Sequence, residues 1–180
     1  MSVGAGLNPA PANAPRLQQA GSPPIYRCMS EHKATLKWTR GGADFSYQKY
    51  PRDHTWSFDG GHTMTGTAAP AYLGNPANVD PEEAFVASIA SCHMLTFLWV
   101  ASRQGFLVES YEDDAVGVMT KNERRVSWVS AVTLHPRIVY GGDTRPSPAD
   151  ERRLHHEAHE QCFIANSVKT QITVAGFDGA

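Results

Sequence analysis

The sequence predicts one domain of the α+β class, in which antiparallel strands surround a single apolar helix. Two observations support this prediction. Short segments with alternating apolar and polar residues, typical of half-buried strands, stand both before and after a long apolar stretch at 80–105. A second, polar-faced helical segment and a last alternating segment then follow. The order strands, helix, strands, helix, strand defines the class.

The apolar stretch is predicted to form the central helix. Asp80 can cap a helix through its side chain, and Pro81 suits the first helical position. Glu83 stands where a capping box has its carboxylate, and Gly105 offers a stop. Residues 85–101 are apolar or small on nearly every face, so we expect the helix to be enclosed on all sides. Charged residues keep the apolar run below the roughly 20 residues of a membrane span, so no membrane partner is predicted.

Composition and charge are those of an ordinary globular domain, with 180 residues and a formal net charge of -2. Without a basic excess, the sequence does not predict a nucleic-acid partner. The three cysteines are widely spaced and do not form the disulfide framework of a small secreted protein, so reduced thiols and a cytoplasmic location are expected. Residues 1–29 are predicted to be a disordered extension and residues 30–180 to be the domain.

Strands are expected on both sides of the central helix. Period-two patterns before it predict three short strands, at 34–40, 43–50 and 54–60, followed by a long loop over 60–79. After it, strands are predicted at 106–110, 113–121 and 126–140, with a closing strand at 169–175. A second helix is predicted over 149–166, because Ser147 can cap it and Pro148 suits its first position.

Cys92 and Cys162 are the two thiols inside predicted helices, and these two helices are the elements we expect to pack together. One interpretation is that both are buried small apolar residues, the usual state of a free cysteine. The alternative is a redox pair, in which one thiol attacks an oxidant and the other converts the sulfenic acid into a disulfide. Because Cys162 lies near a helix end, where unpaired carbonyls disfavour a thiolate, it suits the slower, resolving role.

Two motifs make the chain resemble a known family. The first is Pro81-Glu82-Glu83, followed by a small-residue segment and Cys92. The second is His159-Glu160-Gln161-Cys162, with Asn166 and Ser167. Over about residues 30 to 176, the chain resembles the OsmC/Ohr family of thiol peroxidases.

This resemblance implies an OsmC-like fold, with antiparallel sheets wrapped around a buried central helix, and an intertwined homodimer with active sites at the subunit interface. It implies reduction of organic hydroperoxides as part of an oxidative stress response, without a metal or bound cofactor. Cys92 would be the peroxidatic thiol and Cys162 the resolving thiol. An external dithiol would reduce the resulting disulfide.

The family also uses an arginine, held by the carboxylate that matches Glu82, to keep the first cysteine ionised and to orient the peroxide. A guanidinium suits this task because it stays charged and carries several donors. Arg40 and Arg52 are both candidates, while Ser57 stands where OsmC-like members have an arginine. Glu82 lies about 15 Å from Cys92 along a straight helix. A partner subunit or a helix break is therefore expected to complete the site.

Two positions depart from the family pattern. His93 replaces the aromatic residue that often follows the first cysteine, and Phe163 stands where many members have proline. From the sequence, His93 is a core histidine, a proton relay or a binding-site residue.

The histidines of the second helix suggest an alternative function. His155, His159 and Cys162 fall on one helix face and could hold zinc or copper, although the run is not the HExxH motif of a metalloprotease. A polar outer face is the commoner explanation of such a run. The alternative to a peroxidase is therefore a non-catalytic OsmC-like module that binds a small molecule or a metal.

Overall fold

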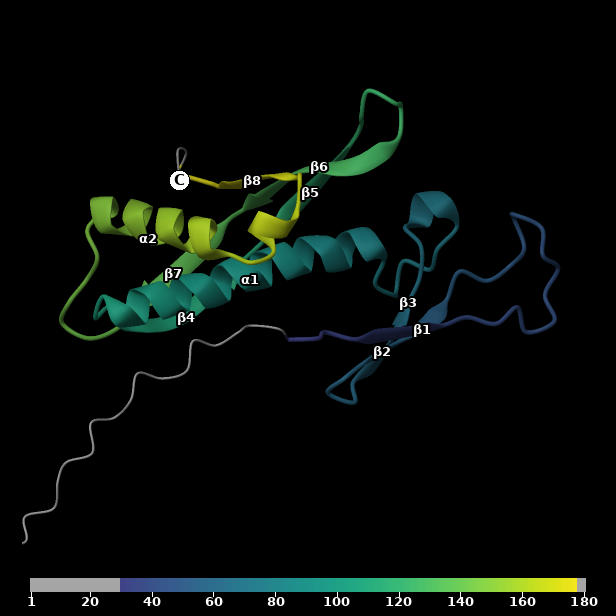
Figure 1. The fold of residues 1–180 in the computed structure, drawn as a ribbon, viewed down its shortest axis with the longest axis horizontal. Coiled ribbons are helices and arrows are strands. Elements are labelled where there is room, and N and C mark those ends of the chain that lie inside the picture. Colours follow the sequence, from purple (N-terminus) through teal and green to yellow (C-terminus); the bar gives the residue numbers. More distant parts are fainter. Residues whose placement is uncertain (1–29, 178–180) are drawn as a thin grey trace, which may run out of the picture. The chain divides into compact units, whose positions relative to one another are not determined.

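The structure, a computed structural model, describes residues 30–177. Its helices and strands belong to a compact unit that begins at Lys33. Two α-helices and eight strands follow in the predicted order of strands, helix, strands, helix, strand (Figure 1). The α+β class is confirmed. The predicted extension at 1–29 lies outside the described residues.

The central helix α1 spans Pro81–Arg103, as its start and stop signals predicted. The Asp80 carboxylate accepts a hydrogen bond from the Glu83 amide at 2.8 Å. In return, the Glu83 carboxylate accepts one from the Asp80 amide at 3.0 Å. These two bonds form the complete capping box, which satisfies amides that have no partner within the helix.

The expectation that α1 is enclosed on all sides was wrong for the single chain. Leu95 is 61% exposed and Trp99 is 44% exposed. The fully covered residues of the helix lie on one side: Ile89, His93, Phe97, Val100 and Ala101. The apolar composition of α1 therefore exceeds what its own chain covers.

By length and composition, α1 passes the test for a membrane-crossing helix, with a mean hydropathy of 1.7 over its most apolar window. The expectation that charged residues make it too short for a span was wrong by this measure. However, α1 packs against α2 and against strands β4, β5 and β6. Only 28% of this window is buried, so much of the apolar surface of α1 is uncovered in the single chain.

The first sheet is antiparallel, in the order β1-β2-β3. Its strands are β1 (Ala34–Lys37), β2 (His54–Phe58) and β3 (Thr63–Gly66), with Leu36 opposite Trp56. The first and third predicted strands are confirmed, whereas β3 falls in the segment predicted as a loop. In Figure 1 this sheet is the blue part of the ribbon, near the first turn of α1.

The strand predicted at 43–50 is absent, because local hydrogen bonds fold this segment into turns. The amides of Lys49 and Tyr50 both donate to the Ser46 carbonyl, at 3.0 and 3.2 Å. The ring of Tyr50 lies 5.2 Å from that of Phe45. The alternating aromatic residues therefore form a local cluster and do not pair with a neighbouring strand.

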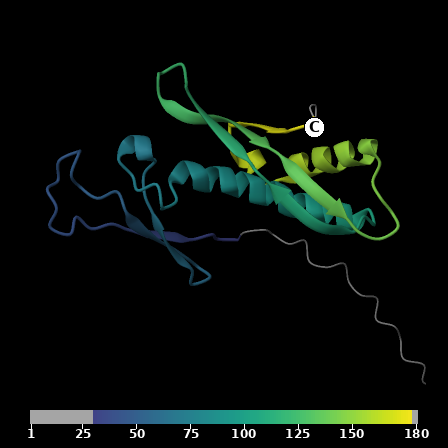
Figure 2. The ribbon, with the colours of Figure 1, turned by 180° about the vertical axis from the view of Figure 1, so that it is seen from behind.

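Two further sheets cover α1 (Figure 2). One pairs β4 (Val108–Asp113) with β7 (Pro136–Tyr140), and the other has the order β5-β6-β8. The latter contains β5 (Val116–Lys121), β6 (Ser127–Leu134) and β8 (Gln171–Val174). The single long strand predicted at 126–140 is divided at His135, directly before Pro136, which has no amide hydrogen to donate to a ladder. β8 pairs with β6 in the parallel direction, so not every strand pair is antiparallel.

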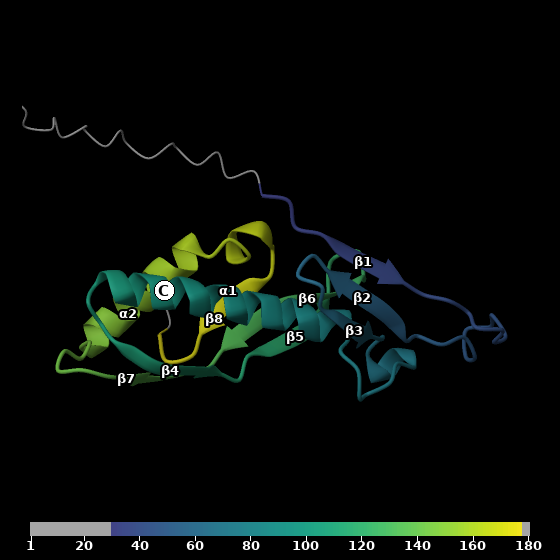
Figure 3. The same cartoon turned by 90° about the horizontal axis from the view of Figure 1, so that it is seen from below.

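The second helix, α2, spans Pro148–Gln161, and Ser147 caps it as predicted. It ends five residues before the predicted boundary, because Cys162 has extended backbone angles and a short 3₁₀ turn follows at Ala165–Ser167. Helix α1 packs against α2, and the two helices cross in the view of Figure 3. One core cluster joins it to α2, through Phe97, Val100, Ala101, Leu154 and Ala158. A second joins it to β6 and β8, through Ile89, Val132, Leu134 and Val174.

Candidate functional site

Cys92 and Cys162 come together although 70 positions separate them in the sequence. Cys92 lies in the middle of α1, and Cys162 is the residue at which α2 ends. The amides of two consecutive residues, Ile164 and Ala165, lie 3.5 Å from Cys92 Sγ and 3.4 Å from Cys162 Sγ, and the two thiols are close enough for Cys92 to raise the pKa of Cys162. Both thiols are free. The packing of the two helices thus creates a reduced dithiol.

The turn after α2 places backbone amides against both sulfurs. The Ile164 amide donates to Cys92 Sγ at 3.5 Å. The Ala165 amide donates to Cys162 Sγ at 3.4 Å. Because these donors are fixed by the backbone, they can stabilise negative charge on a sulfur without reorganisation.

The two thiols differ in environment. Cys162 is buried, whereas Cys92 is partly exposed. Burial, together with the neighbouring Cys92 thiol, raises the pKa of Cys162 to about 11. Cys162 is therefore a protonated thiol at neutral pH and can donate its proton to Cys92 Sγ. This arrangement makes Cys92 the thiol that an external oxidant reaches first.

Cys92 opens into a hollow of about 720 Å³ between α1 and the end of α2. Its size is within the range of small-molecule sites. On the α1 side the hollow is lined by Cys92, Leu95, Thr96 and Trp99, and on the other side by Glu160, Gln161, Phe163 and Asn166.

Neither arginine predicted for the site contacts Cys92 or Glu82 within the described part of the chain. The Arg40 guanidinium donates to the Ala43 carbonyl at 2.6 Å. The Arg52 guanidinium donates to the carbonyl of Tyr47, and its Cζ lies 3.7 Å from the centre of the Tyr50 ring. Both side chains belong to the 38–52 region, which the single chain does not bring to the dithiol.

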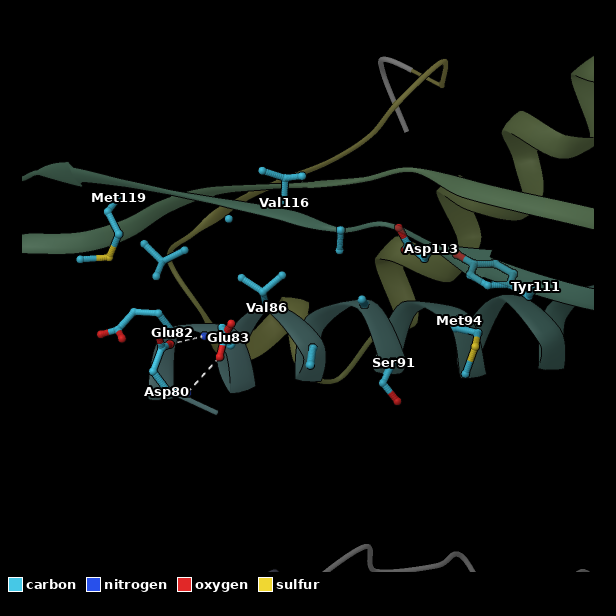
Figure 4. A pocket seen from close by; sticks show the side chains of 15 residues that line it. Asp80, Glu82, Glu83, Val86, Ser91, Met94, Tyr111, Asp113, Val116 and Met119 are labelled. Atoms are coloured by element: carbon cyan, nitrogen blue, oxygen red, sulfur yellow. Dashed lines mark hydrogen bonds between the residues drawn. The ribbon is translucent and has the colours of Figure 1, made fainter. Parts of the chain in front are cut away.

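Glu82 lies in the first turn of α1 and lines a different hollow, of about 670 Å³, between α1 and strands β4 and β5. Figure 4 shows Asp80, Glu82 and Glu83 together at one end of this hollow. Among the residues that the structure describes, no lysine, arginine or histidine lines it. Within one chain, Glu82 and Cys92 thus line different hollows, and the end of the hollow at Glu82 is acidic.

A buried histidine pair connects the two helices next to the dithiol. His93 and His155 are 1% and 0% exposed, and His93 Nε2 lies 3.1 Å from His155 Nδ1. Their rings are stacked with an interplanar angle of 5°. Burial, assisted by the charge of His159, lowers the pKa of His93 to about 4. Burial, assisted by the charge of His93, lowers that of His155 to about 3.

The sequence allowed three interpretations of His93. Its burial in the structure makes it a core histidine. The pairing with His155 was missed. The burial of His93 could have been predicted from the sequence, because His93 stands four residues from both Ile89 and Phe97, on the buried side of α1. Since His155 points into the core, it does not join His159 and Cys162 in a metal site. Residues 30–177 contain no group of three potential metal ligands.

The fold and the dithiol define an α+β protein with two reduced cysteines between its helices. The chain belongs to the OsmC family: the model described as "OsmC-like protein" matches residues 74–175. The comparison with curated proteins found no match.

Solved structures of the same fold agree with this assignment. An OsmC-like protein of unknown function from Vibrio cholerae is 47% identical, with a TM-score of 0.77 over 81% of this chain and 98% of its own. An organic hydroperoxide resistance protein from Legionella pneumophila is 21% identical, with a TM-score of 0.60 over 82% and 98%. The organic hydroperoxide resistance protein OhrB of Bacillus subtilis is 18% identical, with a TM-score of 0.56 over 81% and 95%. At these lower identities, the last two show the fold alone.

Proposed function

We propose that this protein is a thiol peroxidase that reduces organic hydroperoxides through Cys92 and Cys162. The observation that carries the proposal is the contact of two free thiols, one partly exposed and one buried, at the edge of a hollow. Structural neighbours described as organic hydroperoxide resistance proteins add support from fold analogy.

In the proposed cycle, the Cys92 thiolate attacks the terminal oxygen of the hydroperoxide and the O–O bond breaks. Cys92 becomes a sulfenic acid, and the alkoxide leaves as an alcohol after it takes up a proton. The Cys162 thiol then attacks the sulfenic sulfur, which forms the disulfide and releases water. An external dithiol in the cytoplasm reduces this disulfide by thiol exchange and is itself oxidised.

Mass spectrometry after one equivalent of cumene hydroperoxide tests this function. In the wild type we expect one disulfide between Cys92 and Cys162. In Cys162→Ser, a dimedone adduct should appear at Cys92, since no thiol can trap the sulfenic acid. In Cys92→Ser, Cys162 should remain reduced. Unreacted thiols in the wild type after minutes would contradict a peroxidase and favour a non-catalytic binding module.

The proposed enzyme is a homodimer in which each copy completes the site of the other. Its expected interface is the exposed side of α1, where Ala84, Ser88 and Ser91 are small and Leu95 and Trp99 are large, apolar and exposed. Small residues allow close approach of helices, and exposed apolar area favours association.

An antiparallel pairing of two copies of α1 accounts for the position of Glu82. If the helices cross at Ser88, residues equally far from Ser88 lie opposite each other. Cys92 then faces Ala84 of the partner subunit, and Glu82 of the partner subunit is about 3 Å further along the axis. The Glu82 of the partner subunit is therefore closer to Cys92 than the Glu82 of the same chain, which lies about 15 Å away along α1. In this arrangement, a guanidinium from Arg40 or Arg52 can join the partner's Glu82 beside the thiol.

Cross-linking tests this pairing in a chain whose three native cysteines are replaced by serine. Oxidation of the Ser88→Cys variant is expected to give a covalent dimer on a non-reducing gel. Ser102→Cys is the matched control, because it lies on the same exposed helix but would be roughly 40 Å from its counterpart. Equal cross-linking at both positions, or none at Ser88→Cys, would contradict the antiparallel pairing.

A further inference from the structure

The pair of His93 and His155 forms a buried hydrogen bond between the two helices that carry the thiols. His93 directly follows Cys92 on α1, and His155 stands about two helical turns before Cys162 on α2. His93 Nε2 lies 3.1 Å from His155 Nδ1, and both side chains are excluded from solvent. The position of one thiol relative to the other is thus linked to this single polar contact.

The remaining contacts between α1 and α2 do not specify one register of the helices. The core cluster between them consists of apolar residues, whose contacts have no preferred direction. Gln104 forms hydrogen bonds with Arg153 and Glu157, both at 3.1 Å, but these groups are exposed and water competes for them. The buried histidine pair is therefore the contact most sensitive to a slide of α2 along α1.

The histidine pair is poorly suited to a purely stabilising role. One ring donates and the other accepts, so two neutral imidazoles leave one N–H and one ring nitrogen unpaired in either tautomeric arrangement. These two atoms are His93 Nδ1 and His155 Nε2, which are buried and have no hydrogen-bond partner among the described residues. Unpaired buried polar atoms lower stability. A buried polar contact of this kind specifies helix register at a cost in stability, as a single buried asparagine does in a coiled coil.

We propose that His93 and His155 are positioning residues, which hold the two thiols in register for the step that forms the disulfide. This inference rests on the proposed peroxidase function. In that step the S–S bond forms, the S–O bond of the sulfenic acid on Cys92 breaks, and the hydroxyl leaves as water with the proton of Cys162. A disulfide requires Cα atoms about 4.4–6.8 Å apart, so a slide of α2 by one residue, about 1.5 Å, crosses more than half of that range. The histidine hydrogen bond holds the register in which the sulfurs meet.

Two double variants of nearly equal shape test this role at pH 7. His93→Gln with His155→Asn keeps a donor and an acceptor where the paired ring nitrogens lie, whereas His93→Met with His155→Leu keeps neither. After mixing with less than one equivalent of cumene hydroperoxide, dimedone competes with Cys162 for the sulfenic acid. The ratio of adduct to disulfide gives the rate of the resolving step.

The rate of the resolving step is expected to fall about tenfold in the apolar double variant but not in the polar one. The rate at which Cys92 consumes peroxide in the first turnover should change less than about twofold, because this step does not require the second thiol. His156→Gln is the control on α2, since His156 is exposed.

Urea unfolding at pH 7 separates positioning from stability. The apolar double variant is expected to be at least as stable as the wild type, because it removes two unpaired buried groups. Loss of core packing cannot slow the resolving step in a protein of undiminished stability. If the apolar variant does not fold, His155→Asn and His155→Leu provide the same comparison, since only asparagine keeps a partner for His93 Nε2.

The outcomes separate this inference from the proposed function. A wild-type protein that consumes no peroxide contradicts the peroxidase itself. The register is then tested with diamide, an azo oxidant that takes two electrons from the thiols, forms the same disulfide and becomes a hydrazine. Disulfide formation should again be about tenfold slower in the apolar variant. With either oxidant, equal rates in the polar and apolar variants would overturn the role of the histidine pair, and so would a wild type in which diamide forms no disulfide between Cys92 and Cys162.

Discussion

Replacement of Cys92 by serine is expected to lower kcat/KM for cumene hydroperoxide by on the order of 10³-fold or more, because the nucleophile is lost. Cys162→Ser should behave differently. Its first turnover is retained, since Cys92 still attacks the peroxide, but later turnovers with a dithiol reductant slow strongly without a disulfide to reduce. Stopped-flow mixing with less than one equivalent of peroxide, followed by a steady-state assay, distinguishes the two phases.

Cys28→Ser is the matched control for this pair of variants, because it removes the third thiol of the chain, which lies outside the described residues. Its kinetics should equal those of the wild type. If Cys162→Ser turned over at the wild-type rate with the same dithiol, Cys162 would not be the resolving thiol. The raised pKa of Cys162 would then reflect burial in a structural role.

Helix boundaries were predictable from the sequence where the signal is local. The caps at Asp80 and Ser147 depend on side chains within three residues of the helix start, and the structure contains both. The end of α2 was not predictable in this way. Cys162 leaves the helical conformation, and the turn after it, which contacts both sulfurs, depends on the distant α1.

The misassigned strand at 43–50 shows the limit of period-two patterns. Alternating aromatic residues fit a strand, but they also fit a turn in which Phe45 and Tyr50 contact Trp38. Local hydrogen bonds selected the second arrangement. Similarly, the apolar composition of α1 predicted how much surface must be covered but not which molecule covers it. The sequence of one chain cannot distinguish its own core from a surface for a second copy.

Like the fold, the candidate site was predictable from the sequence only in part. The proximity of Cys92 and Cys162 followed from the expected packing of their helices, and the structure brings them together. The arginine expected beside Cys92 was not found there, because neither Arg40 nor Arg52 reaches Cys92 within the described residues. The contact between His93 and His155 depends on the register of two helices, which periodicity does not provide.

This histidine pair leads to the second large expected effect, a loss of stability in mild acid. In the folded protein both imidazoles are neutral, because burial lowers the pKa of His93 to about 4 and that of His155 to about 3. In the unfolded chain, a histidine has a pKa near 6.5. Between about pH 6.5 and 4, the unfolded state therefore binds up to two more protons than the folded state.

The sign of the effect follows from proton linkage. The free energy of unfolding rises with pH wherever the unfolded state binds more protons, so here it falls as the solution is acidified. The contribution is fully present above about pH 6.5. As the pH falls below that value, each histidine removes roughly 1.4 kcal/mol per pH unit. Two histidines together would remove roughly 3 kcal/mol between pH 6 and 5, a large part of the stability of a typical domain.

Urea unfolding at pH 7, 6 and 5, at a fixed protein concentration, measures this slope. The double variant His93→Leu, His155→Phe should lose most of it, because neither replacement can take up a proton. His156→Gln is the control on the same helix, since His156 is exposed and pairs with Glu160 at 3.4 Å. The difference between variants cancels other groups, such as Asp113, whose pKa is raised by burial.

If the double variant does not fold, the imidazole resonances of the wild type provide the test. Those of His93 and His155 should stay unshifted between pH 7 and 5, because burial keeps both imidazoles neutral over this range. The pair lies between the helices that hold Cys92 against Cys162, so protonation would place a charge in this contact without a counter-ion. A wild-type slope equal to that of the double variant would mean that both histidines are accessible to water, and that the contact between α1 and α2 is looser than the structure shows.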